Sequence, residues 1–139
     1  MSKDKQALVL LIGRLAMATI FIVSGIRKSM GFAASVAYMT KNGVPMAEVL
    51  LPIWLIMEIG GGILLIIGWK VKWVALVYAI SMIVITPIFH GFWSFDAAQF
   101  NNQLNHFMKN LAMFGGLLYM WVLGAGAYSV DERGKSGSA

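Results

Sequence analysis

Four long apolar stretches, separated by polar connections, dominate the hydrophobic pattern of this chain. Each holds about 20 mostly apolar residues, which is the length that crosses the hydrocarbon core of a bilayer as an α-helix. The pattern therefore predicts an all-α fold, a four-helix transmembrane bundle over residues 1–128, followed by a flexible cytoplasmic tail at 129–139. The four predicted helices cover residues 7–25, 49–68, 71–89 and 104–123.

The connections between these stretches differ in character. In residues 26–48, Phe32, Val36 and Met39 lie at helical spacing before an Asn-Gly stop, so we expect a short interfacial helix between the first two spans. Residues 69–72 are long enough only for a tight turn. The connection 91–103 carries several aromatic residues among polar ones, which is typical of the bilayer surface.

Composition supports a membrane protein, since 59% of the residues are hydrophobic and only 12% are charged. The chain has no cysteine, which excludes disulfides and thiolate metal sites. Its net charge of +5 is interpreted as a topological signal, and no soluble basic face is left for nucleic acid. Basic residues favour a multi-pass protein with both termini cytoplasmic: Lys3, Lys5, Lys70, Lys72, Arg133 and Lys135 on that side, against Arg27, Lys28, Lys41 and Lys109.

Two ionisable residues interrupt the apolar stretches, Arg14 in the first and Glu58 in the second. A charge at bilayer depth is costly and needs a partner. Arg14 also breaks the apolar core that a secretory signal would need, so the first helix is expected to be retained. Counting residues from the expected outer helix ends places the two charges at similar depth. The sequence therefore predicts a buried ion pair, which either fixes helix packing or faces a ligand.

A second polar set lies at the outer end of the predicted bundle. Helical spacing places His106, Lys109 and Asn110 on one face, while Lys28 and His90 end their own helices on the same side. These five side chains form the predicted ligand site, whose donors and imidazoles suit the oxygens of a quinone head group. The alternative is that the basic residues reach lipid phosphates and His106 merely packs. Two histidines in different helices are a weak basis for haem or iron, and no metal site is predicted.

Several of these segments resemble the DoxX family of small bacterial inner-membrane proteins. The resemblance rests on GRLAMATIFIVSGIRKSMGF, YMTKNGVPM, MEIGGGILLIIGW, FHGFW and NHFMKNLAMFGGLL, which follow one another in the family's order. It implies a four-helix protein of the bacterial inner membrane, in a family named after subunits of quinol oxidase and thiosulfate:quinone oxidoreductase systems. The positions that match the family's motifs are Arg14, Gly25, Lys28, Gly31, Phe32, Glu58, His90, Trp93, His106, Lys109 and Asn110.

Residues and resemblance together predict an accessory membrane subunit of a quinone-linked redox or respiratory system, with a quinone-like amphiphile as its ligand and no covalent cofactor. We expect no catalysis by this chain alone, because no nucleophile triad or phosphate loop is present. Two alternatives stay open. One is a non-catalytic scaffold that docks onto a larger membrane redox complex. The other is a small-solute carrier, which would need a homo-oligomer because four helices alone leave little room for an aqueous path.

Overall fold

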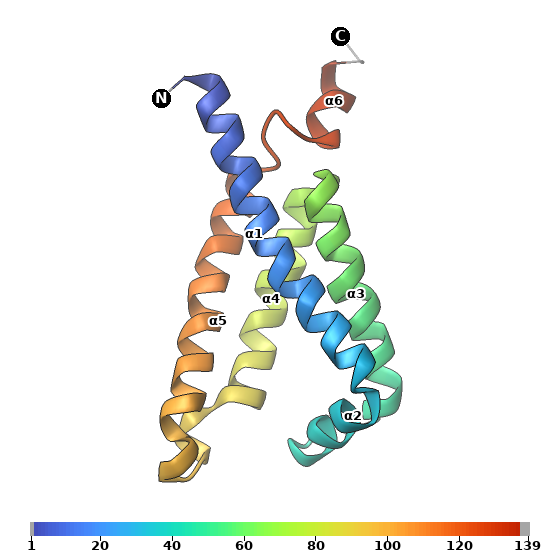
Figure 1. The fold of residues 1–139 in the computed structure, drawn as a ribbon, viewed down its shortest axis with the longest axis vertical. Helices are drawn as coiled ribbons and strands as arrows, with labels where there is room; N and C mark the ends of the chain where they lie inside the picture. The colour runs from blue at the N-terminus through green and yellow to red at the C-terminus, as the bar shows by residue number, and fades with distance from the viewer. Residues whose placement is uncertain (1, 137–139) are drawn as a thin grey trace. The chain divides into compact units, whose positions relative to one another are not determined.

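The protein is all α-helical throughout the part of the chain that the structure, a computed structural model, describes, namely residues 2–136. This confirms the predicted fold class, and the expected short helix between the first two apolar stretches is present as well. The helices are α1 (Lys3–Met30), α2 (Phe32–Lys41), α3 (Ala47–Ile67), α4 (Val71–His90), α5 (Ala97–Leu123) and α6 (Val130–Ser136), with a 3-10 turn, η1 (Phe92–Ser94), after α4 (Figure 1).

Helix caps explain why two of the helices are longer than their apolar stretches. The hydroxyl of Ser2 accepts a hydrogen bond from the backbone N–H of Lys5, so α1 begins in the polar residues before Ala7. In the same way the carboxylate of Asp96 accepts from the N–H of Gln99 and starts α5 ahead of its predicted first residue. α1 also continues past Gly25 to Met30, so Lys28 lies within the helix.

Three of the helices in the described part of the chain are long and apolar enough to cross a membrane. They are α1, α3 and α4, the last counted together with η1. α5 is 27 residues long, but its first half is rich in Asn, Gln, His and Lys, so its mean hydropathy is lower. A fourth membrane crossing by α5 stays a prediction.

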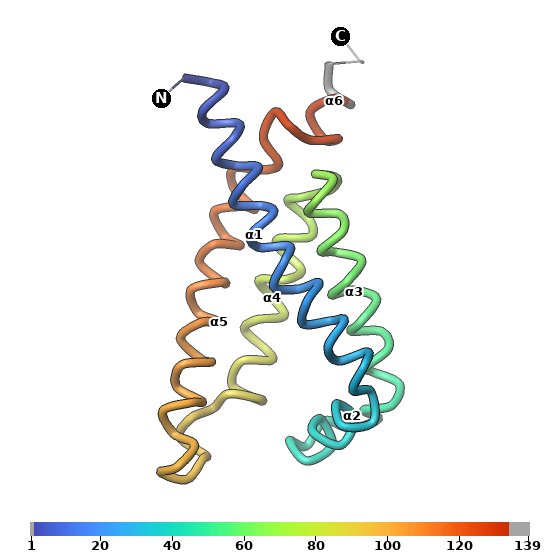
Figure 2. The backbone as a smooth tube through the Cα atoms, viewed as in Figure 1, coloured from blue at the N-terminus to red at the C-terminus, as the bar shows by residue number. Residues whose placement is uncertain are grey.

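The described chain divides into two compact units. The first contains everything up to Val71 together with the segment from Ala125 onward, and the second covers Lys72–Gly124. Within the first unit α1 runs beside α3, α2 packs near the junction of these helices, and α6 lies by the end of α3 (Figures 1 and 2). The start of α1 and α6 therefore lie at the same end of this unit.

Glycines allow α1 and α3 to approach closely. A Cβ atom on Gly25 would stand 2.6 Å from Cγ1 of Ile59, and one on Gly62 would stand 2.5 Å from Cγ1 of Ile22. These contacts pair the end of α1 with the middle of α3 and the middle of α1 with the later part of α3, so the helices are antiparallel. Small residues that bring two backbones together are a common basis of helix packing in membranes.

We expect Gly62→Ala to lower the free energy of unfolding by about 1–3 kcal/mol, because the added methyl group would push Ile22 away from α3. Gly60→Ala in the same helix is the matched control. Nothing lies within 4 Å of a Cβ at Gly60, so that variant should be neutral or slightly more stable. Thermal unfolding of the protein in lipid nanodiscs measures both, and equal losses in the two variants would contradict this packing.

The segment after α5 does not match the flexible tail predicted from residue 129. Residues 130–136 form α6, and the N–H of Asp131 donates to the carbonyl of Gly68. The Asp131 carboxylate in turn accepts from the N–H groups of Lys70 and Val71, 2.8 and 3.0 Å away. These backbone contacts tie the segment to the α3–α4 turn. The remainder of the predicted tail, residues 137–139, lies outside the described residues.

Candidate functional site

The buried carboxylate of the first unit is paired with Lys28. Nζ of Lys28 lies 2.7 and 2.9 Å from the two carboxylate oxygens of Glu58, and 2.8 Å from the hydroxyl of Ser24 one helical turn earlier. The Glu58 side chain is only 4% exposed, whereas that of Lys28 is 36% exposed. The three N–H donors of the ammonium are therefore all engaged. Lys28 has no donor left for the head group that the sequence analysis assigned to it.

Arg14 is buried elsewhere, in a cage of backbone carbonyls. Its guanidinium donates to the carbonyl oxygens of Ala125, of Tyr128 at 2.7 Å and of Ile66 at 3.4 Å. The residue is 2% exposed, and its Nε is buried without a hydrogen-bond partner. Ile66 lies in the last turn of α3, where helix carbonyls carry partial negative charge and favour a cation. Arg14 thus joins α1 to the end of α3 and to the segment after α5.

The predicted ion pair of Arg14 with Glu58 is wrong, because the register of α1 against α3 differs from the assumed one. The prediction placed Gly25 level with Val49, at the outer ends of the two helices. In the structure Gly25 lies against Glu58 and Ile59, while Gly68 lies against Arg14. The difference of about nine residues corresponds to roughly 14 Å along the helices. Arg14 is consequently level with the end of α3, and Glu58 near its middle.

The second unit brings the two histidines together. The rings of His90 in α4 and His106 in α5 stack with centroids 4.9 Å apart and planes 17° from parallel. Nδ1 of His90 is 2.9 Å from Oε1 of Gln103, a buried side chain one turn before His106. An amide oxygen only accepts, so Nδ1 carries the proton, and Nε2 of a neutral His90 ring is the acceptor.

A second polar contact joins α4 and α5 one turn before His90 and one turn after His106. Nδ2 of Asn110 donates to the hydroxyl of Thr86 at 3.1 Å, and Thr86 is buried. Lys109 lies next to Asn110 and is exposed. Sequence spacing had placed His106, Lys109 and Asn110 on one face of a helix and His90 nearby, and the contacts of the two histidines agree with it. Gln103 and Thr86, the partners of His90 and Asn110, lie outside the predicted set of five ligand residues.

An aromatic cluster surrounds the turn between α4 and α5. Phe92 lies edge to face against Trp93, Phe100 and Phe107, with ring centroids 5.1 to 5.4 Å apart. Gly91 makes the turn possible, since a Cβ there would stand 2.6 Å from the carbonyl oxygen of Pro87. This apolar cluster follows His90 directly in the chain.

Within the described residues no group of three or more His, Asp and Glu side chains is placed to hold a metal ion. The polar groups of the second unit are imidazole, amide, hydroxyl and ammonium, which are hydrogen-bonding groups for an oxygen-bearing ligand. Groups of these kinds can hydrogen-bond to such a ligand and exchange a proton with it.

Comparison with known proteins identifies the family. The sequence model described as DoxX matches residues 9–91. The inner membrane protein YphA of Escherichia coli (strain K12) is 32% identical over 128 residues, which are 92% of this chain and 91% of that protein. The inner membrane protein YqjF of the same organism is 35% identical over 130 residues, 94% of this chain and 95% of the relative.

A more distant match is the Surfeit locus protein 4 homolog of Schizosaccharomyces pombe, which is 34% identical over 74 residues, 52% of this chain and 24% of that protein. No solved structure matches the chain. The two bacterial relatives are matched over nearly their whole length, and the family model covers more than half of this chain. The chain is therefore an integral membrane protein that belongs to the DoxX family.

Proposed function

We propose that the protein is an accessory membrane subunit of a quinone-linked redox system, and that the stacked pair of His90 and His106 binds the head group of a quinone-like amphiphile. The protein would lie in the bacterial inner membrane with both termini in the cytoplasm, alongside a larger redox complex or as a homo-oligomer. The observation that carries the proposal is the histidine stack, in which Nδ1 of His90 contacts the amide oxygen of Gln103 and Lys109 follows His106 by one helical turn.

The chemistry follows from the neighbours of each ring. A ring N–H of the histidine pair can hydrogen-bond to a quinone oxygen, and the Lys109 ammonium and the Asn110 amide supply further donors. Lys28 is omitted from this ligand set because its donors are bound by Glu58 and Ser24.

Ligand-dependent thermal stability of the purified protein in nanodiscs tests the proposal. Decylubiquinone is expected to raise the unfolding midpoint, whereas decylbenzene, which has the same chain and no oxygen, should not. The double variant His106→Ala/Lys109→Ala should lose the shift. Lys41→Ala, which removes an exposed ammonium from α2, should keep it. Equal shifts with both ligands, or a shift that survives the double variant, would overturn head-group binding.

A further inference from the structure

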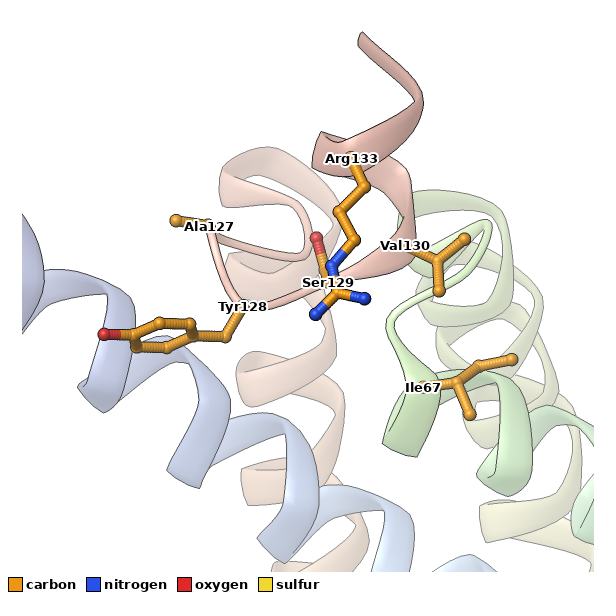
Figure 3. A pocket seen from close by; sticks show the side chains of 6 residues that line it. All are labelled: Ile67, Ala127, Tyr128, Ser129, Val130 and Arg133. Carbon is orange, nitrogen blue, oxygen red and sulfur yellow. The ribbon is translucent and has the colours of Figure 1, made fainter. Parts of the chain in front are cut away.

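A pocket of about 200 Å³ lies at the end of the first unit where α3 ends and α6 begins. We call it the α6 pocket. Its lining combines apolar side chains with one guanidinium group, and Figure 3 shows the Arg133 side chain reaching down beside Ser129 while Ile67 and Val130 form the facing wall. The lining residues are Ile67, Ala127, Tyr128, Ser129, Val130 and Arg133.

The position of the α6 pocket corresponds to the surface of a bilayer. Ile67 is the last residue of α3, one of the three helices in the described chain that are apolar and long enough to span. Trp69, two residues after it, is 47% exposed, and Tyr128 is 52% exposed. Exposed Trp and Tyr side chains at the end of a span are typical of the head-group level. A ligand of the α6 pocket is therefore expected to be a molecule of the membrane surface.

Several hydrogen-bond acceptors next to the α6 pocket are bound by protein donors. The carbonyl oxygens of Ala125 and Tyr128 accept from the buried guanidinium of Arg14, and that of Gly126 accepts from the Ser129 hydroxyl. The carboxylate of Asp131 accepts from two backbone N–H groups. These acceptors are therefore engaged within the protein, and the lining of the pocket itself contributes one guanidinium group, that of Arg133.

We propose that the α6 pocket binds the phosphate of an anionic phospholipid, with Arg133 contacting the phosphate oxygens and Ile67 and Val130 packing against the glycerol and first methylene groups. A guanidinium pairs well with phosphate, and basic side chains at the membrane surface attract anionic lipids. A phospholipid also matches the division of this lining into a charged part and an apolar part. The site is separate from the histidine pair and does not depend on the proposed quinone role.

Lipid-dependent stability of the full chain tests this site. We expect a higher unfolding midpoint in nanodiscs of phosphatidylethanolamine with phosphatidylglycerol than in nanodiscs of phosphatidylethanolamine alone, and retention of phosphatidylglycerol in native mass spectra. Arg133→Ala should remove at least half of this difference, and Arg133→Lys should retain part of it. Arg27→Ala, which removes an exposed cation near the far end of α1, is the matched control and should keep the full difference.

Two further experiments test whether the stabilisation comes from a phospholipid bound in the α6 pocket. Val130→Asp puts an acidic residue at the first position of α6, where helices favour one, but sets a carboxylate against the phosphate, so the lipid preference should fall while α6 is kept. Glycerol 3-phosphate is added to the protein in detergent as the soluble probe. Stabilisation by this probe equal to that by the lipid would overturn the lipid assignment. Equal lipid preference in Arg133→Ala, Val130→Asp and Arg27→Ala would overturn the site itself.

Discussion

Replacing Lys28 with methionine is expected to destabilise the protein by about 3–5 kcal/mol, the usual cost of removing one partner from a buried ion pair. The Glu58 side chain is 4% exposed and receives two hydrogen bonds from the Lys28 ammonium. Methionine preserves most of the length and apolar volume of lysine but none of its donors. The buried carboxylate would then lose this cation while staying far from water.

The double variant Lys28→Met/Glu58→Leu separates the charge effect from packing. Replacing both members of a buried pair with apolar residues is often neutral or stabilising, so the double variant should recover most of the loss. Lys41→Met, which changes an exposed lysine of α2 in the same way, should be close to wild type. The fraction folded in nanodiscs as a function of temperature gives all three values. A double variant as unstable as Lys28→Met would show that the pair is not coupled.

Sequence periodicity was sufficient for the helices but not for the way two of them pair. The apolar stretches located α1, α3 and α4, yet α1 runs past Gly25 to Met30 and begins at the cap formed by Ser2. Residue depths counted from the ends of the apolar stretches therefore gave the wrong register of α1 against α3. As a result, Glu58 was paired with Arg14 and not with Lys28. The glycine contacts that set the register join residues far apart in the chain, and no local spacing reports them.

A different limit applies to the surroundings of Arg14. Its partners are backbone carbonyls of Ile66, Ala125 and Tyr128, and every residue type carries a carbonyl. Side-chain identity therefore contains no signal for this cage. In α5, by contrast, polar side chains recur at helical spacing, so His106 and Asn110 were placed on one face correctly. The spacing of Asp96 and Gln99, typical of a helix start, could also have located the beginning of α5.

Arg14→Met is expected to release the segment 125–136 from the end of α3. The change would leave buried carbonyls without their donor, at about 1–3 kcal/mol for each group that stays dry, and it would remove the charge from the last turn of α3. Hydrogen exchange of the Asp131 N–H, which donates to the Gly68 carbonyl, should become faster, and trypsin should cleave more readily after Arg133.

Two comparisons decide whether Arg14 acts through this segment alone. Arg14→Lys keeps the charge but cannot reach several carbonyls in one plane, so it should give an intermediate exchange rate. Lys28→Met lowers stability at the middle of α3, and should leave the ratio of Asp131 exchange to global unfolding unchanged. Because the segment forms most of the α6 pocket, Arg14→Met should also lose the preference for anionic lipid, whereas Lys28→Met should retain it below its unfolding midpoint. Unchanged exchange at Asp131 in Arg14→Met would mean that the bonds of Asp131 to Gly68, Lys70 and Val71 hold the segment without Arg14.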